Sequence, residues 1–360
     1  MKTIVYVAIA FVVGSSSAAE RLGEPVPCLK GLDPVALTQG QELPGDSGIS
    51  TVRGRYRYLF ASEENKATFE KHPNRYSIQL GGGCGRMGPL SGVGSPDRFL
   101  VHDGRIYIFA SDQCRNGFKA APEKHIEADD PPPTGSEANL ARGQELVQRA
   151  LVGFGGATKV DAITSLELKR VRTYQADGAD KEQATYSRVI FPDQFRLEDI
   201  WHTGSSADFV RGDRGYRAEG DQAWPMDEIV RREFLKTFRR NPLVLLKARK
   251  ESGFRAVAAG RGQVGDQEVE WLAIGLGGST NTLGIDATTG RVHSVRYRGR
   301  APSAIGDVQR TFSDFREVDG LIVPFGIAVS LNDSPTTQAV RFANVSVNPK
   351  LDDKLFAVPE

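Results

Sequence analysis

Three consecutive prolines, Pro131, Pro132 and Pro133, divide this chain of 360 residues into two parts. They lie in the stretch "ADDPPPTGSEAN", residues 128–139, whose other residues are mostly polar or small. Proline has no backbone N–H and a fixed φ, so neither a helix nor a central strand can continue through this stretch. We therefore predict a semi-rigid linker over residues 128–139, between a shorter and a longer folded region.

The first nineteen residues have the pattern of a secretory signal peptide. Lys2 precedes an apolar run over residues 4–13, and small residues such as Ser17 and Ala19 follow it. The run is too short to span a bilayer, and no later stretch is long and apolar enough to form an integral membrane segment. We expect cleavage after Ala19, at the end of a signal peptide over residues 1–19, and a soluble periplasmic or secreted protein. The net charge of +1 gives no overall attraction to nucleic acid, so we expect no nucleic-acid partner.

The shorter region contains one small unit written twice. The stretch "GRYRYLFASEENKATFEKHP" begins at Gly54 and "GRIYIFASDQCRNGFKAAP" begins at Gly104. The equivalent pairs Phe60 and Phe109, Phe69 and Phe118, and Pro73 and Pro122 are each 49 residues apart. The pattern predicts a half-buried strand followed by a short helix, with Ser62 or Ser111 as the helix N-cap. One unit is too small to bury a stable core, so we expect the two copies to pack together.

Residues 28–127 resemble a YHS domain, with the later part as a diverged second copy. The residues that carry the resemblance are "GLDPVAL", "YRYLFASEENKATFEKHPNRY" and the "LGGGC" that follows. YHS units are related to small treble-clef-like metal-binding modules, in which an F-C-S-x-x-C turn supplies thiolates. This chain matches that turn at Cys114, whereas Ala61, Asn65 and Ala110 stand at the other cysteine positions.

The three cysteines, Cys28, Cys84 and Cys114, all precede the linker. In an oxidising compartment they favour a disulfide between Cys84 and Cys114 that joins the two copies, with one thiol left over. The alternative is a soft-metal site for copper or zinc, formed by Cys84, Met87, His102 and Cys114. Cys28 could replace either disulfide partner, so the pairing stays open at the level of sequence.

The longer region predicts a large antiparallel sheet. A helix capped by Ser136 and extending to about Leu151 comes first, and then segments such as "LELKRVRTY", "VEWLAIGL" and "LIVPFGIAVSL" alternate polar and apolar residues between Gly, Asn and Asp turns. One helical stretch interrupts them, with Val230, Phe234 and Phe238 on one stripe. The fold class is therefore α+β, with a sheet curled over helices.

Residues 140–360 resemble the lipoprotein-carrier (LolA/LolB-like, outer-membrane lipoprotein-sorting) domains. The matching stretches are "LVQRALVGFGGATKVDAITSLELKRVRTY", "TLGIDATTGRVHSVRYRG", "FSDFREVDGLIVPFGI" and "VSVNPKLDDKLFAVPE". The resemblance implies a curved antiparallel half-barrel with covering helices and an apolar cavity for acyl chains. The large apolar residues predicted to line that cavity are Phe195, Trp201, Phe209, Trp224, Phe234, Trp271 and Phe325.

The basic helical stretch "RREFLKTFRR" permits two interpretations. Its bases are Arg231, Arg232, Lys236, Arg239 and Arg240. They could belong to a lid helix whose charges meet anionic head groups over the cavity. They could instead form the solvent-exposed face of a helix that packs on the sheet.

No motif of an enzyme is found along the chain. The glycine-rich stretches lack the lysine and spacing of a phosphate loop, and there is no G-x-S-x-G, H-E-x-x-H or C-x-x-C. We therefore predict a non-enzymatic exported protein without a cofactor, which holds a lipid or another amphipathic small molecule in the longer region. The alternative function is soft-metal handling by the shorter region.

Overall fold

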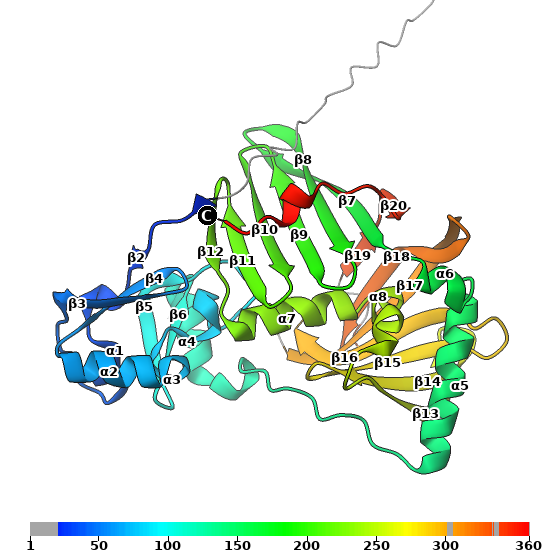
Figure 1. The fold of residues 1–360 in the computed structure, drawn as a ribbon, viewed down its shortest axis with the longest axis horizontal. Helices are drawn as coiled ribbons and strands as arrows, with labels where there is room; N and C mark the ends of the chain where they lie inside the picture. Colours follow the sequence, from blue (N-terminus) through cyan, green and yellow to red (C-terminus); the bar gives the residue numbers. More distant parts are fainter. Residues whose placement is uncertain (1–20, 301–304, 333, 335–337, 360) are drawn as a thin grey trace, which may run out of the picture.

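The computed structural model describes residues 21–300, 305–332, 334 and 338–359. The signal peptide predicted for residues 1–19 lies outside the described residues. The chain forms two regions joined by the proline stretch, and both combine helices with mainly antiparallel strands (Figure 1). The predicted α+β class is confirmed. In the described ranges no helix has the length and hydrophobicity needed to cross a membrane.

The first region is built from two small sheets with helices against them. Its strands are β2 (Val26–Pro27), β3 (Asp46–Arg53), β4 (Tyr56–Phe60), β5 (Ser95–His102) and β6 (Arg105–Phe109). Its helices are α1 (Pro34–Thr38), α2 (Glu63–Lys71), α3 (Pro73–Tyr76) and α4 (Asp112–Ala120), with short 3-10 turns η1 (Leu29–Gly31), η2 (Gln79–Gly82) and η3 (Pro122–Lys124). The strand orders are β2-β4-β3 and β5-β6.

The two copies of the repeated unit have the same local structure. The backbone N–H of Asn65 donates to the Ser62 hydroxyl at 3.2 Å, and that of Cys114 donates to Ser111 at the same distance. Both predicted N-caps are therefore present. The hairpins also share a register shift, between Asp46 and Ser50 in the first copy and between Ser95 and Phe99 in the second. The second pair of positions follows the first by the 49 residues seen in the sequence.

The aromatic cores of the two copies match as closely as their hairpins. The Phe69 ring lies 4.9 Å from the Tyr58 ring and 5.3 Å from the Phe60 ring. The equivalent distances around Phe118 are 4.8 and 5.3 Å. These rings are buried, so the first region has a filled core. The resemblance of residues 28–127 to a YHS domain stays a prediction.

The proline stretch lies against the second region. The backbone N–H of Asp130 donates to Gly278 at 3.0 Å, and its carboxylate accepts a bond from the N–H of Thr280, also at 3.0 Å. The carbonyl of Pro133 accepts a bond from Arg255 at 2.8 Å. The helix α5 (Glu137–Gly153) follows, and its first residues overlap the end of the stretch 128–139, whose role as a linker stays a prediction. The N-cap of α5 is Ser136, as predicted.

The second region contains two sheets. The eight-stranded sheet has the order β1-β12-β11-β10-β9-β8-β7-β20, and the seven-stranded sheet runs in order from β13 to β19. The first comprises β1 (Arg21–Leu22), β7 (Ser165–Ala176), β8 (Ala179–Ile190), β9 (Gln194–Trp201), β10 (Gly204–Arg211), β11 (Arg214–Glu219), β12 (Gln222–Pro225) and β20 (Asn344–Val347). The second comprises β13 (Arg255–Val264), β14 (Gln267–Leu276), β15 (Ser279–Asp286), β16 (Val292–Arg300), β17 (Ile305–Val318), β18 (Leu321–Leu331) and β19 (Gln338–Arg341).

Two sheets replace the single curled sheet that we expected. The chain crosses between them directly after β19. The N–H of Phe342 donates to the carbonyl of Phe325 in one sheet at 2.8 Å, and the N–H of Ala343 donates to Lys169 in the other at 2.7 Å. This crossing holds the edges of the two sheets together, so that they enclose a common interior.

Helices occupy and flank that interior. They are α6 (Ala157–Asp161), α7 (Glu228–Arg239) and α8 (Pro242–Lys247), with α5 along β13 and the short turns η4 (Ala248–Lys250) and η5 (Asp353–Phe356). Figure 1 shows α7 and α8 between the sheets. The predicted stripe of Val230, Phe234 and Phe238 is buried. The last two belong to one core cluster with residues of both sheets.

The two regions contact each other through arginines of both, and in the first region Arg55 pairs with Glu219 at 3.0 Å. Arg217 donates to the carbonyls of Pro89 and Ser91 at 3.2 Å, and Arg300 donates to the carbonyl of Arg86 at 2.8 Å. These bonds fasten the loop after η2 to the second region. The sequence had left open whether the two regions pack together.

Candidate functional site: a cavity between the sheets

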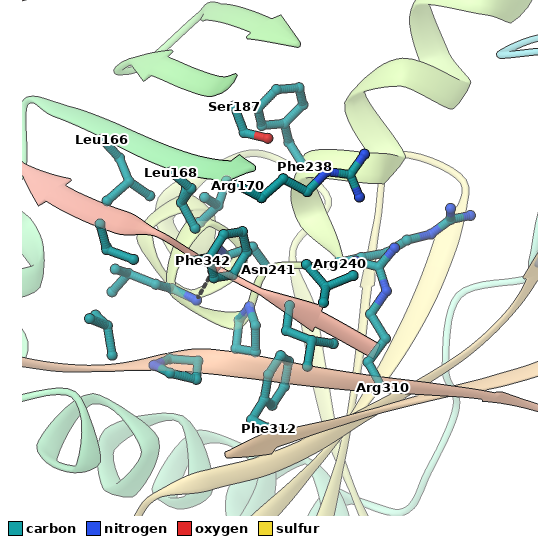
Figure 2. A pocket seen from close by; sticks show the side chains of 18 of the residues that line it. Leu166, Leu168, Arg170, Ser187, Phe238, Arg240, Asn241, Arg310, Phe312 and Phe342 are labelled. Atoms are coloured by element: carbon teal, nitrogen blue, oxygen red, sulfur yellow. Dashed lines mark hydrogen bonds between the residues drawn. The ribbon is translucent and has the colours of Figure 1, made fainter. Parts of the chain in front are cut away.

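A cavity of about 290 Å³ lies between the two sheets, beside the end of α7 and the start of α8 (Figure 2). Apolar side chains form most of its wall. From the eight-stranded sheet these include Leu166, Leu168, Val189, Leu197 and Val345. From the seven-stranded sheet and the helices they include Phe312, Val323, Ile327, Val329, Val340, Phe238, Leu243 and Val244.

Strand alternation explains the wall formed by the eight-stranded sheet. Every second residue of a strand points to the same face. The cross-strand pairs that line the cavity are Leu166 with Val189, Leu168 with Ser187, and Arg170 with Thr185. The wall therefore changes from apolar to polar along β7 and β8, and the change ends at an arginine.

The seven-stranded sheet shows the same gradient. One cross-strand row of the wall is Phe312, Ile327 and Val340, and the next row is Arg310, Val329 and Gln338. Each sheet thus contributes one arginine beyond an apolar patch. The cavity has an apolar body and a cationic end.

The five bases of the stretch "RREFLKTFRR" fall into two groups, according to whether they form ion pairs. Four of its five bases form ion pairs with nearby acids: Arg231 with Glu228 at 2.8 Å, Arg232 with Asp129 at 3.0 Å, Lys236 with Asp129 at 2.8 Å, and Arg239 with Glu251 at 3.0 Å. The fifth, Arg240, lines the cavity instead. Its guanidinium lies 4.2 Å from the centre of the Tyr297 ring, and burial lowers its pKa. The bases are half-buried or buried rather than fully exposed, and an encounter with anionic head groups stays a prediction.

The aromatic residues predicted to line the cavity lie elsewhere. None of the seven is among the residues that line it in the described structure. Phe209 lies on the outer face of the eight-stranded sheet, in a cluster with Val358. Trp271 lies on the outer face of the seven-stranded sheet, under the Arg296 guanidinium at 4.0 Å. Trp224 faces the first region, where its indole N–H donates to the carbonyl of Glu24.

The other four lie beside the cavity or at its margins. Phe195 and Phe234 pack on Phe238, with ring centres 5.2 and 5.1 Å away, so they form a layer behind one wall residue. Phe325 is buried under the guanidinium of Arg316. Trp201 ends β9 and is half-buried. The phenylalanines that do line the cavity are Phe154, Phe238, Phe312 and Phe342, none of which was among the residues predicted to line it. The alternation in "LELKR" was the signal that could have identified Leu166, Leu168 and Arg170.

The predicted sulfur site is only partly assembled. Cys84 is fully buried, and Cys114 packs against the same cluster, which contains Phe118. The hydrogen bond with Ser111 lowers the pKa of the Cys114 thiol, against the effect of burial, and the Cys84 thiol lowers it further. Both are thiols in the structure. Their proximity agrees with the predicted pairing, which stays a prediction.

The other predicted metal ligands are His102 and Met87. His102 packs edge-on against Phe118 at 5.8 Å, and Met87 is partly exposed. Across the described residues, no group of three or more His, Cys, Asp or Glu is placed to hold a metal ion. Cys28 lies in a different cluster, where its thiol donates to the carbonyl of Arg57 at 3.3 Å and burial raises its pKa. The copper or zinc alternative gains no support from this arrangement.

Comparison with known proteins finds similarity among solved structures alone. No family model and no curated protein matches the chain. An outer membrane lipoprotein-sorting protein domain from Vibrio parahaemolyticus aligns with 61% of this chain and 97% of its own, at 11% identity and a TM-score of 0.40. A LolA superfamily protein from Nitrosomonas europaea aligns with 60% of this chain and 97% of its own, at 10% identity and a TM-score of 0.39.

A DUF1329 family protein from Desulfovibrio piger aligns with 61% of this chain and 97% of its own, at 12% identity and a TM-score of 0.41. The first two titles name the family that we expected for residues 140–360, and membership of that family stays a prediction. At this level of identity and overlap, the function has to be argued from the cavity itself.

Proposed function

We propose that this protein binds an amphipathic small molecule, such as a single-chain lipid, in the cavity between its two sheets, and that it does so without catalysis. The observation that carries the proposal is the cavity itself, with an apolar body of about 290 Å³ and a few polar groups at one end. Ligand sites in proteins typically enclose about 300 to 1,000 Å³ and have this mixture of walls. The signal peptide predicted for residues 1–19 supports binding in the periplasm or outside the cell.

Burial of an alkyl chain would supply the affinity. Each buried methylene contributes about 0.8 kcal/mol. About ten methylenes would therefore give up to about 8 kcal/mol, the binding free energy of a micromolar complex. The wall residues are held by two sheets and two helices, so the site is largely formed before binding, which lowers the cost of ordering it.

Two measurements test the proposal. The first is mass spectrometry of an organic-solvent extract of the purified protein, which should reveal a bound lipid. The second is titration with a fluorescent acyl probe, which should show saturable binding. The informative variant is Ser187→Phe, which puts a ring into the cavity. Its matched control is Thr173→Phe, which adds the same ring to an exposed position on the outer face of the same sheet.

We expect Ser187→Phe to weaken probe binding at least tenfold and Thr173→Phe to leave it unchanged. Far-UV circular dichroism and the melting temperature report whether each variant is folded. If the wild-type protein carries no lipid and does not saturate with the probe, the proposal is wrong. Equal binding by folded Ser187→Phe and by the wild type would also contradict it.

A further inference from the structure

Three arginines gather at one end of the cavity. Arg170 comes from β7, Arg240 from the end of α7, and Arg310 from β17. In Figure 2 their guanidinium groups lie on the opposite side of the cavity from Leu166 and Leu168. Arg240 and Arg310 share the Tyr297 ring, with guanidinium carbons 4.2 and 5.4 Å from its centre. Three elements that are distant in the sequence thus bring positive charge to one place.

Within the described residues, these three arginines differ from the bases of α7 because no acid forms an ion pair with them. In the part of the chain that the structure describes, no carboxylate lies within 4.0 Å of any of the three guanidinium groups. The Nε atoms of Arg170 and Arg310 are buried without a hydrogen-bond acceptor. A buried donor that loses its bond to water and gains no other is costly. Such donors are expected where a ligand supplies the acceptor.

The acids in the neighbourhood are already engaged. Asp199 is the acid whose charge acts on Arg170, but its carboxylate accepts hydrogen bonds from Gln183 and Thr185. Of the two acids whose charges act on Arg240, Glu233 accepts a bond from Lys236 at 2.7 Å. The other, Glu127, also faces Arg300 and Lys236, and burial raises its pKa. These acids offset part of the positive charge, but in the described structure none of them forms an ion pair with Arg170, Arg240 or Arg310.

The guanidinium groups of Arg240 and Arg310 lie near the Tyr297 ring, and the described structure gives neither group a hydrogen-bonded acceptor. A guanidinium that lies over a ring uses its face for that contact, and its N–H groups point outward in its own plane. This is the geometry in which arginine binds the two oxygens of a carboxylate or a phosphate. The cluster therefore has both the charge and the donors that an oxyanion requires.

We propose that the ligand is an amphipathic anion, with a carboxylate or phosphate head among Arg170, Arg240 and Arg310 and an alkyl chain that extends toward Leu166. This inference rests on the proposed function, because it assigns the polar end of the same ligand. Carboxylate and phosphate share the chemistry that matters here, which is a compact oxyanion at the end of a single chain.

The test is a set of four ligands with one chain and different heads. Dodecanoate, dodecyl phosphate, dodecanol and dodecyltrimethylammonium are each titrated, below their micelle concentrations, against the fluorescent acyl probe bound to the full protein. We expect the two anions to bind about 10- to 100-fold more tightly than dodecanol, which is the range for hydrogen bonds to a charged group. The cation should bind more weakly than dodecanol. The ratio of the two anions shows which head the site prefers.

Matched variants locate the effect. Arg310→Gln should lower dodecanoate affinity about tenfold and leave dodecanol affinity within about twofold, and Arg310→Lys should restore part of the loss. The control is Arg296→Gln on the adjacent strand, whose side chain lies on the outer face over Trp271. It should change neither affinity.

The outcomes separate the two proposals. If no dodecyl compound displaces the probe, the proposed function itself fails. If all four bind and dodecanol equals the anions, binding is real and the inference about the head group is wrong. Equal losses for dodecanoate and dodecanol in Arg310→Gln would also overturn it. If Arg310→Gln does not fold, the affinities of the four ligands for the wild-type protein still show whether the site prefers an anionic head group.

Discussion

The arginines on the two faces of the eight-stranded sheet differ in whether they form ion pairs. On the outer face, Arg188 pairs with Glu167 at 2.6 Å and also with Glu198, and Arg196 pairs with Glu198 at 2.9 Å. Arg196 also donates to the carbonyl of Leu355, in the segment that covers this face. The outer arginines are therefore part of a closed network of charge.

On the inner face, Arg170 has no such network. Its strand neighbours Leu168 and Leu166 are apolar, and its Nε is buried without an acceptor in the described structure. The same residue type thus stabilises the fold on one face and meets a cavity on the other. The comparison teaches that pairing, rather than the presence of charge, distinguishes a structural arginine from one available to a ligand. The predictions below test this difference.

The largest effect is expected on the outer face. Glu198→Gln removes the shared partner of two buried arginines, and breaking a buried pair costs about 3 to 5 kcal/mol. Urea denaturation should show this loss in the free energy of unfolding, with unchanged dodecanoate affinity for the folded protein. The exposed Glu182→Gln is the control and should stay within about 0.5 kcal/mol of the wild type. A loss of ligand binding in Glu198→Gln without a loss of stability would reverse the assignment of the two faces.

A disulfide between Cys84 and Cys114, outside the cavity, would be a second stabilising element. Oxidised glutathione should convert Cys84 and Cys114 to a disulfide, with release of two molecules of reduced glutathione per bond. Closure of a loop of this length contributes roughly 3 kcal/mol to the free energy of unfolding. Thiol counting and peptide mapping check the bond, and Cys28→Ser should form it equally well. A disulfide that involves Cys28 would contradict the predicted pairing. A change in probe affinity on oxidation would show that the cysteine pair and the cavity are not independent.

On the inner face the expected effect is on binding. Arg170→Met keeps an apolar stem of similar length and removes a charge that has no partner, so the free energy of unfolding should stay the same or rise by up to about 1 kcal/mol. Dodecanoate affinity should fall about tenfold, as for a lost hydrogen bond to a charged group. Denaturation and titration of the same sample give both values. A clear loss of stability would show that Arg170 is structural, like Arg188.

The smallest effect is a dependence of stability on pH. Burial raises the pKa of Glu198, but Arg196 and Arg188 outweigh burial and hold the pKa below its ordinary value of 4.5. A lowered folded-state pKa gives stability that is present above 4.5 and is lost as the pH falls through the folded-state value. The urea midpoint of the wild type should therefore drop more steeply below about pH 4.5 than that of Glu198→Gln. Parallel pH profiles would mean that Glu198 does not supply this dependence.

Local patterns in the sequence predicted much of the fold. Examples are the repeat around Phe60 and Phe109, the caps at Ser62 and Ser111, and the stripe that contains Phe234. Each of these features depends on residues that are close together in the sequence. These features therefore appear in the structure where they were expected.

The cavity depends on contacts between distant segments, and the sequence did not reveal its walls. Alternation shows that Arg310 and Phe312 share a face, but it does not say whether that face is inner or outer. That choice is made where the chain crosses between sheets at Phe342 and Ala343, and no local pattern marks this crossing. Residue size was misleading as well, because Phe209 and Trp271 fill cores on the outer faces.

The most direct test of the central claim is a crystal structure with 12-bromododecanoate, in which anomalous scattering locates the bromine. The bromine marks the far end of the alkyl chain. The account predicts a single bromine peak between the sheets near Leu166 and Val345, with the carboxylate among the three arginines. A bromine in the separate groove beside α8 that is lined by Phe191 and Phe195, or a chain in the cavity with the reverse orientation, would contradict it.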